Sequence, residues 1–287
     1  MPAALVPHPL TRERLLAQAQ AMPPAALILA RLRELLEDVN TGLDEIAELI
    51  RGDPALVARV LRIGNSVAFG GTGRVSTVDE AVNRVGFAEV LRLVGVAVAG
   101  SMADAPLRCY GIPVARLREA LLLHALAAET LGDAVGIDPA TAYSAGLLRG
   151  LGIMVIDRAA RDVLRPVDYY TAGHYANYAK WELAQFGVLG TEVAGMVFDE
   201  WHLPSEMVFA VQHHQLLDRV GWNDRFACLL NLAGAVAMAE GLSLPGEVLC
   251  WKSTPQIFDL LGLSDETFEP IQREAVRRFN AQRQLLR

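Results

Sequence analysis

Apolar residues at spacings of three and four recur along most of the chain, and this period constrains the fold more than any other feature of the sequence. One such stripe follows the Asp53–Pro54 pair, a combination typical of a helix start. Its apolar members are Leu56, Val57, Val60, Leu61 and Ile63. Thr41 with Asp44 and Ser76 with Asp79 resemble capping boxes that open two neighbouring helices. No segment of strand length alternates apolar with polar residues as clearly, so the sequence predicts an all-α protein.

The helical period lapses between Ala103 and Pro113, where prolines and a glycine gather. We therefore predict an N-terminal helical lobe over residues 1–108, a second helical lobe over 109–245 and a C-terminal helical extension over 246–287. The further helices predicted by periodicity and start signals are Pro113–Leu131, Asp138 to about Ile156, Thr191–Trp201, Pro204–His214 and Asp224–Glu240.

Composition excludes several classes of protein. With 52% hydrophobic and 21% charged residues, the 287-residue chain is too apolar to be disordered. Its 26 basic and 33 acidic residues give a net charge of −7, the wrong sign for a surface that neutralises nucleic acid or an anionic membrane. We expect neither as a partner.

Targeting and cysteine patterns point to the cytoplasm. No stretch near the start reads as a signal peptide, and the longest apolar run, Leu93–Ala99, is far shorter than the ~20 residues that span a bilayer. This run predicts a buried helix. Cys109, Cys228 and Cys250 have no CxxC spacing, so we expect reduced and mostly buried thiols.

Several motifs stand in a specific order. Asp53–Val98 contains an Asp-Pro-Ala-Leu start, then the Leu-x-x-x-Asn-Ser-x-x-Phe stretch, then a helix that ends in Gly86. Trp201–His214 adds a Trp-x-Leu-Pro stretch followed by His-His. Together these motifs resemble the HDOD domain over about residues 15–240. The resemblance implies an all-helical bacterial signalling module related to the HD phosphohydrolases.

The motif loop of this resemblance contains Asn65, Ser66 and Phe69. Asn and Ser side chains satisfy backbone groups locally, so Asn65 and Ser66 can simply cap the preceding helix and shape the glycine-rich turn. Direct contact with a ligand is the alternative. The first interpretation requires nothing beyond the turn itself.

The resemblance also allows the metal site of the HD phosphohydrolases to be compared residue by residue. In those enzymes a His, a His-Asp dyad and a later Asp bind a divalent metal. The first His corresponds to His124, but Arg149 and Gly150 stand at the dyad. Related domains often show Asp-His where this chain has Leu189 and Gly190.

Gly234 occupies the place of the late Asp, which leaves His124 and the His213–His214 pair as possible ligands. Arg149 has no lone pair to donate and carries a permanent positive charge. We therefore predict a degenerate pocket with no metal, no cofactor and no catalytic residue.

The residues that remain in the pocket each have a structural explanation as well as a functional one. His124 lies on an apolar helix, which favours a hydrogen-bonded core histidine over a ligand. Adjacent helical residues point about 100° apart, so at most one of His213 and His214 faces the pocket, and we select His213. A buried Arg149 requires an acid, for which Glu182 and Glu192 are candidates, or else it binds a phosphate or another anion.

Two further segments are distinctive. Ile271–Arg287 carries five arginines and predicts an amphipathic helix, either docked on the body or available to a nucleic acid or an acidic partner. The stretch Tyr169–Trp181 is dense in aromatic residues, which suits either an interface or a connecting segment that packs its own rings.

Three functional hypotheses follow. The first is a non-catalytic regulatory module that binds a signalling protein. The second is a residual metal-dependent phosphohydrolase acting on a nucleotide or cyclic dinucleotide. The third is a nucleotide-binding sensor that uses Arg149 and His124 without chemistry.

Overall fold

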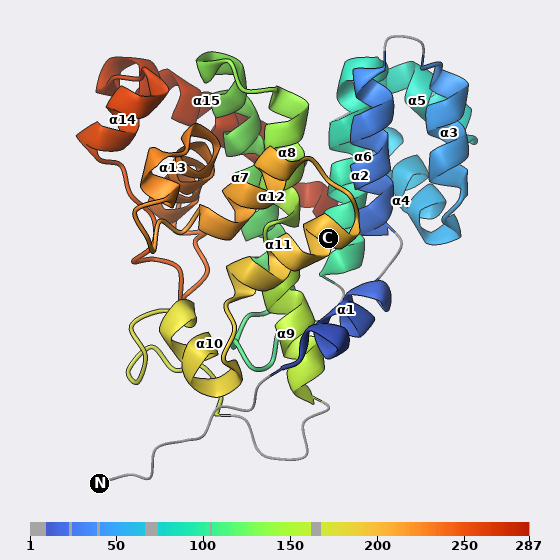
Figure 1. Ribbon diagram of the computed structural model, residues 1–287. Coiled ribbons are helices and arrows are strands. Elements are labelled where there is room, and N and C mark those ends of the chain that lie inside the picture. The colour runs from blue at the N-terminus through green and yellow to red at the C-terminus, as the bar shows by residue number, and fades with distance from the viewer. Residues whose placement is uncertain are drawn as a thin grey trace, which may run out of the picture.

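The computed structural model describes residues 10–22, 25–38, 41–66, 74–103, 105–161 and 168–286. These residues form α-helices joined by turns and short 3-10 segments (Figure 1). Within the same ranges no strand is present, and the only β-type contact is an isolated bridge between Leu107 and Ile112. The predicted all-α class is confirmed.

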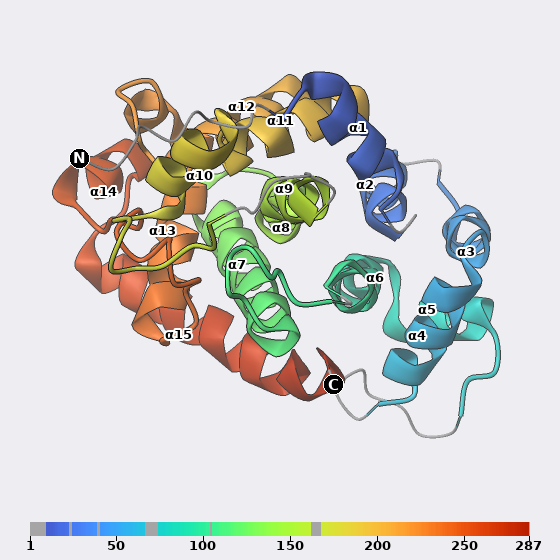
Figure 2. The same cartoon turned by 90° about the horizontal axis from the view of Figure 1, so that it is seen from below.

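Five helices gather into an N-terminal group. They are α2 (Ala25–Glu37), α3 (Leu43–Arg51), α4 (Pro54–Gly64), α5 (Val78–Val85) and α6 (Phe87–Met102). Helix α6 packs against α2, α4 and α5, and Figure 2 shows it between these helices and the rest of the molecule. The apolar run Leu93–Ala99 lies in α6 and is buried along its whole length.

The second group is arranged around α7. Its helices are α7 (Val114–Val135), α8 (Pro139–Leu148), α9 (Leu151–Arg161), α10 (Tyr178–Phe186), α11 (Gly190–Glu200), α12 (Ser205–His213) and α13 (Arg225–Ala239). Helix α7 packs against α8 and α13 (Figure 2). The single helix predicted from Asp138 to about Ile156 is in fact two, because the chain turns at Arg149–Gly150 between α8 and α9.

The end regions of the chain pack on this second group. After α14 (Pro255–Leu261), helix α15 (Asp265–Gln282) lies along α7 and buries Ala275 and Phe279, so the predicted docked amphipathic helix is confirmed. Arg277 and Arg278 pair with Glu274. Helix α1 (Arg12–Gln20), which we placed in the N-terminal lobe, packs instead on α9 and α11.

Side-chain caps explain where several helices begin. Asp53 accepts a hydrogen bond from the Leu56 N–H, and Asp138 accepts one from the Thr141 N–H, as their Asp-Pro pairs predict. The capping box predicted at Ser76 lies one residue later, where Thr77 Oγ1 accepts from the Glu80 N–H. The box predicted at Thr41 does not form, because Gly42 precedes α3 and has no side chain; only the Gly42 N–H donates to Glu45 Oε1.

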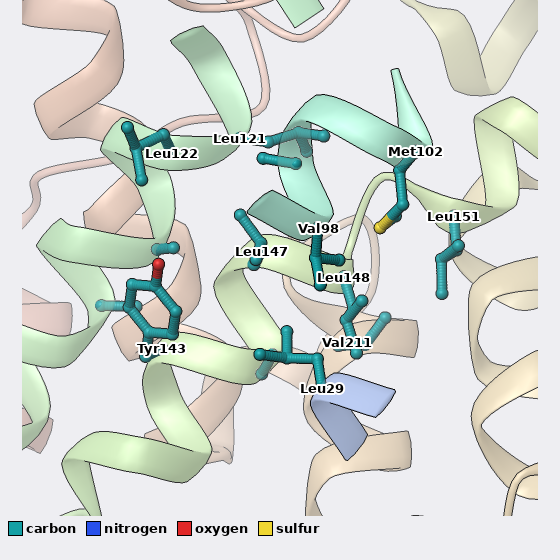
Figure 3. Close-up of a cluster of buried hydrophobic side chains, with 14 of the residues drawn as sticks. Leu29, Val98, Met102, Leu121, Leu122, Tyr143, Leu147, Leu148, Leu151 and Val211 are labelled. Carbon is teal, nitrogen blue, oxygen red and sulfur yellow. The ribbon is translucent and has the colours of Figure 1, made fainter. Parts of the chain in front are cut away.

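The two groups share one hydrophobic core. Figure 3 shows Leu29 of α2 and Val98 of α6 in the same buried cluster as Leu147 and Leu148 of α8. Gly95 permits this close approach, because a Cβ atom there would lie 2.3 Å from the Tyr143 hydroxyl oxygen of α8. The groups therefore fold against each other rather than as separate domains.

Among the described residues, Pro139–Arg161 is the one helical stretch long and apolar enough to cross a membrane. Its most apolar window is 89% buried inside the protein, where it forms the core described above. Cys109, Cys228 and Cys250 are free and buried, in agreement with the sequence prediction.

Candidate functional site

Five buried side chains from distant parts of the sequence meet beside α7. His124 lies in the middle of α7, Arg149 follows α8, and His214 follows α12. Glu247 and Trp251 come from the segment between α13 and α14. The His124 ring centroid lies 6.4 Å from that of His214 and 5.5 Å from the indole of Trp251. We call these five residues the central cluster.

Arg149 and Glu247 form a bidentate ion pair in this cluster. Arg149 Nη1 donates to Glu247 Oε1 at 2.8 Å, and Nη2 donates to Oε2 at 3.1 Å. Only 2% of either side chain is exposed. A planar guanidinium matches a carboxylate in this fork geometry, and each charge offsets the desolvation of the other.

The acids that we proposed for Arg149 have other partners. Glu182 accepts hydrogen bonds from the Tyr110 hydroxyl and the Gly190 N–H, both at 2.7 Å. Burial raises the pKa of Glu182 to about 7, although those two hydrogen bonds oppose the shift. Glu192 accepts from the Leu189 N–H at the start of α11. Arg149 does pair with a buried acid, as predicted, but the acid is Glu247 and not Glu182 or Glu192.

Trp251 fills the space between the two histidines and Arg149. Its indole stacks on the His214 ring at 5.8 Å between centroids, and the Arg149 guanidinium lies 5.1 Å from the indole centroid. The indole N–H donates to Ser243 Oγ at 2.8 Å. Gly234 makes room for this ring, because a Cβ atom at that position would lie 2.3 Å from it.

Asn231 on α13 holds the Trp251 segment in place. Its Nδ2 donates to the carbonyls of His214 and Cys250, and its Oδ1 accepts from the Lys252 N–H. The residues on both sides of Trp251 are thus hydrogen-bonded to one fully buried amide. This arrangement fixes the indole against His214.

The histidine pair differs from our prediction. His214, not His213, faces the central cluster: it is 1% exposed, and its Nδ1 lies 2.7 Å from the Val211 carbonyl oxygen. Burial and the nearby Arg149 charge lower the pKa of His214 to about 3. His213 points outward, where its Nδ1 lies 3.1 Å from Asp218 Oδ2.

His124 is a core histidine, as predicted, but not a hydrogen-bonded one. Among the described residues neither ring nitrogen has a well-formed hydrogen bond, although a weak interaction with the Leu230 backbone favours the protonated ring. Burial and then Arg149 hold its pKa well below the ordinary value. Both buried histidines are therefore neutral at pH 7.

This burial predicts a pH effect on His124→Leu. The unfolded chain binds a proton at His124 below about pH 6.5 whereas the folded protein does not, so this group lowers stability as the pH falls. We therefore compare the unfolding free energy of the variant with that of the unmodified protein at each pH. This difference is expected to shift in favour of the variant by about 2 kcal/mol when the pH is lowered from 7.5 to 5. Urea denaturation at the two pH values measures this shift, and an equal difference at both would contradict the burial of a neutral ring.

At the remaining positions of the metal-site comparison, the glycines lie close to neighbouring side chains. A Cβ atom at Gly150 would lie 2.8 Å from Leu121 Cδ2, and one at Gly190 would lie 2.8 Å from Glu182 Oε1. No group of three or more His, Cys, Asp or Glu side chains in the described ranges could hold a metal ion. Two imidazoles beside a guanidinium do not fit the donor set of a catalytic dication.

The Asn65 loop has a structural role. Asn65 Nδ2 donates to the carbonyls of Leu61 and Val75, and its Oδ1 accepts from the Val75 N–H at 2.8 Å. These bonds join the end of α4 to the segment before α5, in agreement with the capping interpretation. Ser66 Oγ has no hydrogen-bond partner within the described part of the chain, and Phe69 lies outside it.

The aromatic stretch packs largely on itself. Tyr170, Tyr178 and Trp181 make edge-to-face contacts at 4.5 to 6.0 Å between centroids, and Tyr110 from the segment before α7 joins them. The Trp181 indole N–H donates to the Asp168 carbonyl. This is the connecting segment that packs its own rings, rather than a free aromatic surface.

Comparison with known protein families matches residues 22–217 to the HDOD domain. The chain belongs to the HDOD domain family. The match spans α2 to the end of α12 and so includes His124, Arg149 and His214. Glu247 and Trp251 lie beyond the matched HDOD region, and the chain supplies these two members of the central cluster from its C-terminal extension.

Solved structures share this HDOD fold. An HDOD domain protein with unknown function from Geobacter sulfurreducens is 19% identical, with a TM-score of 0.65 over 96% of this chain and 99% of that one. A "putative phosphohydrolase" from Shewanella amazonensis SB2B is 20% identical, with a TM-score of 0.66 over 96% and 98% of the two chains. At these identities the likeness shows the fold alone.

Two longer proteins also match. A "putative signal transduction protein" from Marinobacter aquaeolei VT8 is 20% identical, with a TM-score of 0.67 over 96% of this chain and 65% of that one. An uncharacterized protein from Treponema pallidum (strain Nichols) is 27% identical over 193 residues, which are 66% of this chain. The aligned part makes up only 36% of that relative.

Proposed function

We propose that this HDOD protein is a non-catalytic regulatory module of the cytoplasm that acts by binding another signalling protein. The observation that carries the proposal is the buried Arg149–Glu247 pair covered by Trp251, at the place where the resemblance puts the metal site of HD phosphohydrolases. The pair is internally neutral and packed, so it offers neither ligands nor an activated water.

Electrostatics support the same conclusion. Arg149 brings a permanent positive charge beside both buried imidazoles and already depresses their pKa values. A divalent cation at these rings would meet the same repulsion with twice the charge. Glu247, the one carboxylate of the central cluster, has both oxygens engaged by Arg149.

The names of the structural neighbours support both a signalling role and a phosphohydrolase role, so the central cluster has to decide between them. A phosphohydrolase of this fold needs a metal to activate water and to neutralise the phosphoester. In this chain an arginine, a leucine and three glycines stand at the positions of the ligands, and a tryptophan fills the space beside them. The regulatory role is therefore favoured.

Hydrolysis assays test this proposal. The purified protein is incubated with bis-p-nitrophenyl phosphate and with cyclic dinucleotides, in the presence of Mn²⁺ or Mg²⁺. We expect no turnover above the metal-only blank, and no concentration-dependent rise in melting temperature with the cyclic dinucleotides. Turnover that disappears in His124→Leu and persists in a surface control, Glu266→Lys, would establish the phosphohydrolase instead.

A further inference from the structure

An open groove lies between the two helical groups, on the face where α2 and α3 approach the end of α11. Its volume is about 770 Å³, within the range of roughly 300–1,000 Å³ that is usual for binding pockets. The lining residues are Arg31, Glu34, Leu35, Asp38, Leu49, Glu200, Trp201 and His202. We call this feature the inter-lobe groove.

The groove has an apolar floor and an acidic rim. Leu35, Leu49 and Trp201 are partly buried and pack against the hydrophobic core. Around them, among the described residues, stand the carboxylates of Glu34, Asp38 and Glu200 and the guanidinium of Arg31. An occupant of matching chemistry therefore carries an apolar side chain between positive charges.

Trp201 has an unused hydrogen-bond donor. The other three tryptophans, Trp181, Trp222 and Trp251, donate their indole N–H to a carbonyl or hydroxyl oxygen of the protein. The Trp201 indole has no hydrogen-bond partner among the described residues, and its ring lines the groove. A backbone carbonyl of a bound peptide would complete it, and tryptophan is among the residues that most often dominate binding interfaces.

The turn that carries Trp201 has an uncommon backbone. His202 adopts a φ of 56°, in the left-handed region that non-glycine residues rarely occupy. Hydrogen bonds from the His202 N–H to the Asp199 carbonyl and from the Leu203 N–H to the Phe198 carbonyl hold the turn. Leu203 is buried beneath it. The turn therefore presents Trp201 and His202 to the groove in one fixed arrangement.

We propose that the inter-lobe groove binds a peptide segment of the partner protein, with an apolar side chain on Trp201 and flanking Lys or Arg residues against Glu34 and Glu200. This inference rests on the proposed regulatory role and names the chemistry of the partner. The net charge of −7 also favours such a segment, because the negative protein attracts the positively charged peptide.

An array of 12-residue peptides tests the proposal on the full chain. Each peptide carries a central Leu or Phe flanked by Lys and Arg, by Gln, or by Glu, and fluorescence anisotropy measures the affinity of those retained. We expect binding only in the Lys and Arg set, with an affinity that falls as the salt concentration rises. Equal binding of the Gln set would overturn the proposal.

Variants locate the binding to the groove. Glu34→Lys combined with Glu200→Lys is expected to weaken binding at least tenfold, and Trp201→Phe about fivefold because the ring remains but its donor is lost. The matched control reverses two exposed acids of α15, Glu266→Lys with Glu269→Lys, and should leave the affinity unchanged. Circular dichroism and melting temperature confirm that each variant is folded.

The outcomes separate this inference from the proposed function. If no peptide binds, or if binding survives the Glu34 and Glu200 reversals, the groove proposal fails while the hydrolysis assays still decide the regulatory role. If peptides bind as expected and phosphodiester hydrolysis is also found, the groove stands and the non-catalytic role fails.

Discussion

Replacing Glu247 by alanine is expected to lower the free energy of unfolding by about 3–5 kcal/mol. The loss is large because Arg149 cannot give up its charge and would remain 2% exposed without a counter-ion. Urea denaturation followed by circular dichroism measures the change in unfolding free energy. A loss below about 1 kcal/mol, the size found for surface pairs, would show that water reaches Arg149 and that the pair is not buried.

The matched control removes both charges together. Arg149→Met with Glu247→Leu replaces the pair by apolar groups of similar size, and such replacements in buried ion pairs are often neutral or stabilising by about 1–4 kcal/mol. We therefore expect the double variant to be more stable than Glu247→Ala. A double variant as unstable as the single one would mean that the pair contributes specific hydrogen-bonded structure rather than mutual charge compensation.

The second large effect is expected for Trp251→Ala, which should cost about 3–5 kcal/mol of unfolding free energy. The indole is only 3% exposed and fills the space between His124, His214 and Gly234. The variant loses this packing and the contact with Arg149, and it leaves a cavity lined by unpartnered imidazole nitrogens.

Trp251→Phe is the control for this prediction. It keeps an aromatic ring on His214 but loses the hydrogen bond to Ser243 Oγ. We therefore expect Trp251→Phe to lose about half as much unfolding free energy as Trp251→Ala. Equal stability of Trp251→Ala and the unmodified protein would contradict the role of Trp251 as the filling of the central cluster.

Much of the fold could be predicted from the sequence because local signals determine it. Asp53 and Asp138 each precede a proline, a pair of residues typical of a helix start. In the structure both side chains accept a hydrogen bond from a backbone N–H of the first turn. The break at Arg149–Gly150 was missed because the residues on both sides of it are buried, which leaves no polar gap in the pattern. Packing of α1 on α9 is a long-range contact without a local signal.

The candidate site was only partly predictable. The resemblance put His124 and Arg149 in one predicted pocket, and the structure brings both of them against Trp251. Glu247 is 98 residues from Arg149 and belongs to the extension, so neither motif nor spacing links the two. We selected His213 over His214 from its position in the motif, whereas the helical period of the buried residues would have selected His214. His214 continues the buried stripe of Met207, Ala210 and Val211 at a spacing of seven from its first member, whereas His213 does not.

Thermal denaturation with added metal tests most directly whether the Arg149–Glu247 ion pair and Trp251 occupy the site that a metal would need. Any cation that binds the native state alone raises the melting temperature as its concentration rises. We predict the same melting temperature in EDTA and throughout a titration with Mn²⁺ or Fe²⁺. A concentration-dependent rise in the unmodified protein that is abolished by His124→Leu would contradict the account.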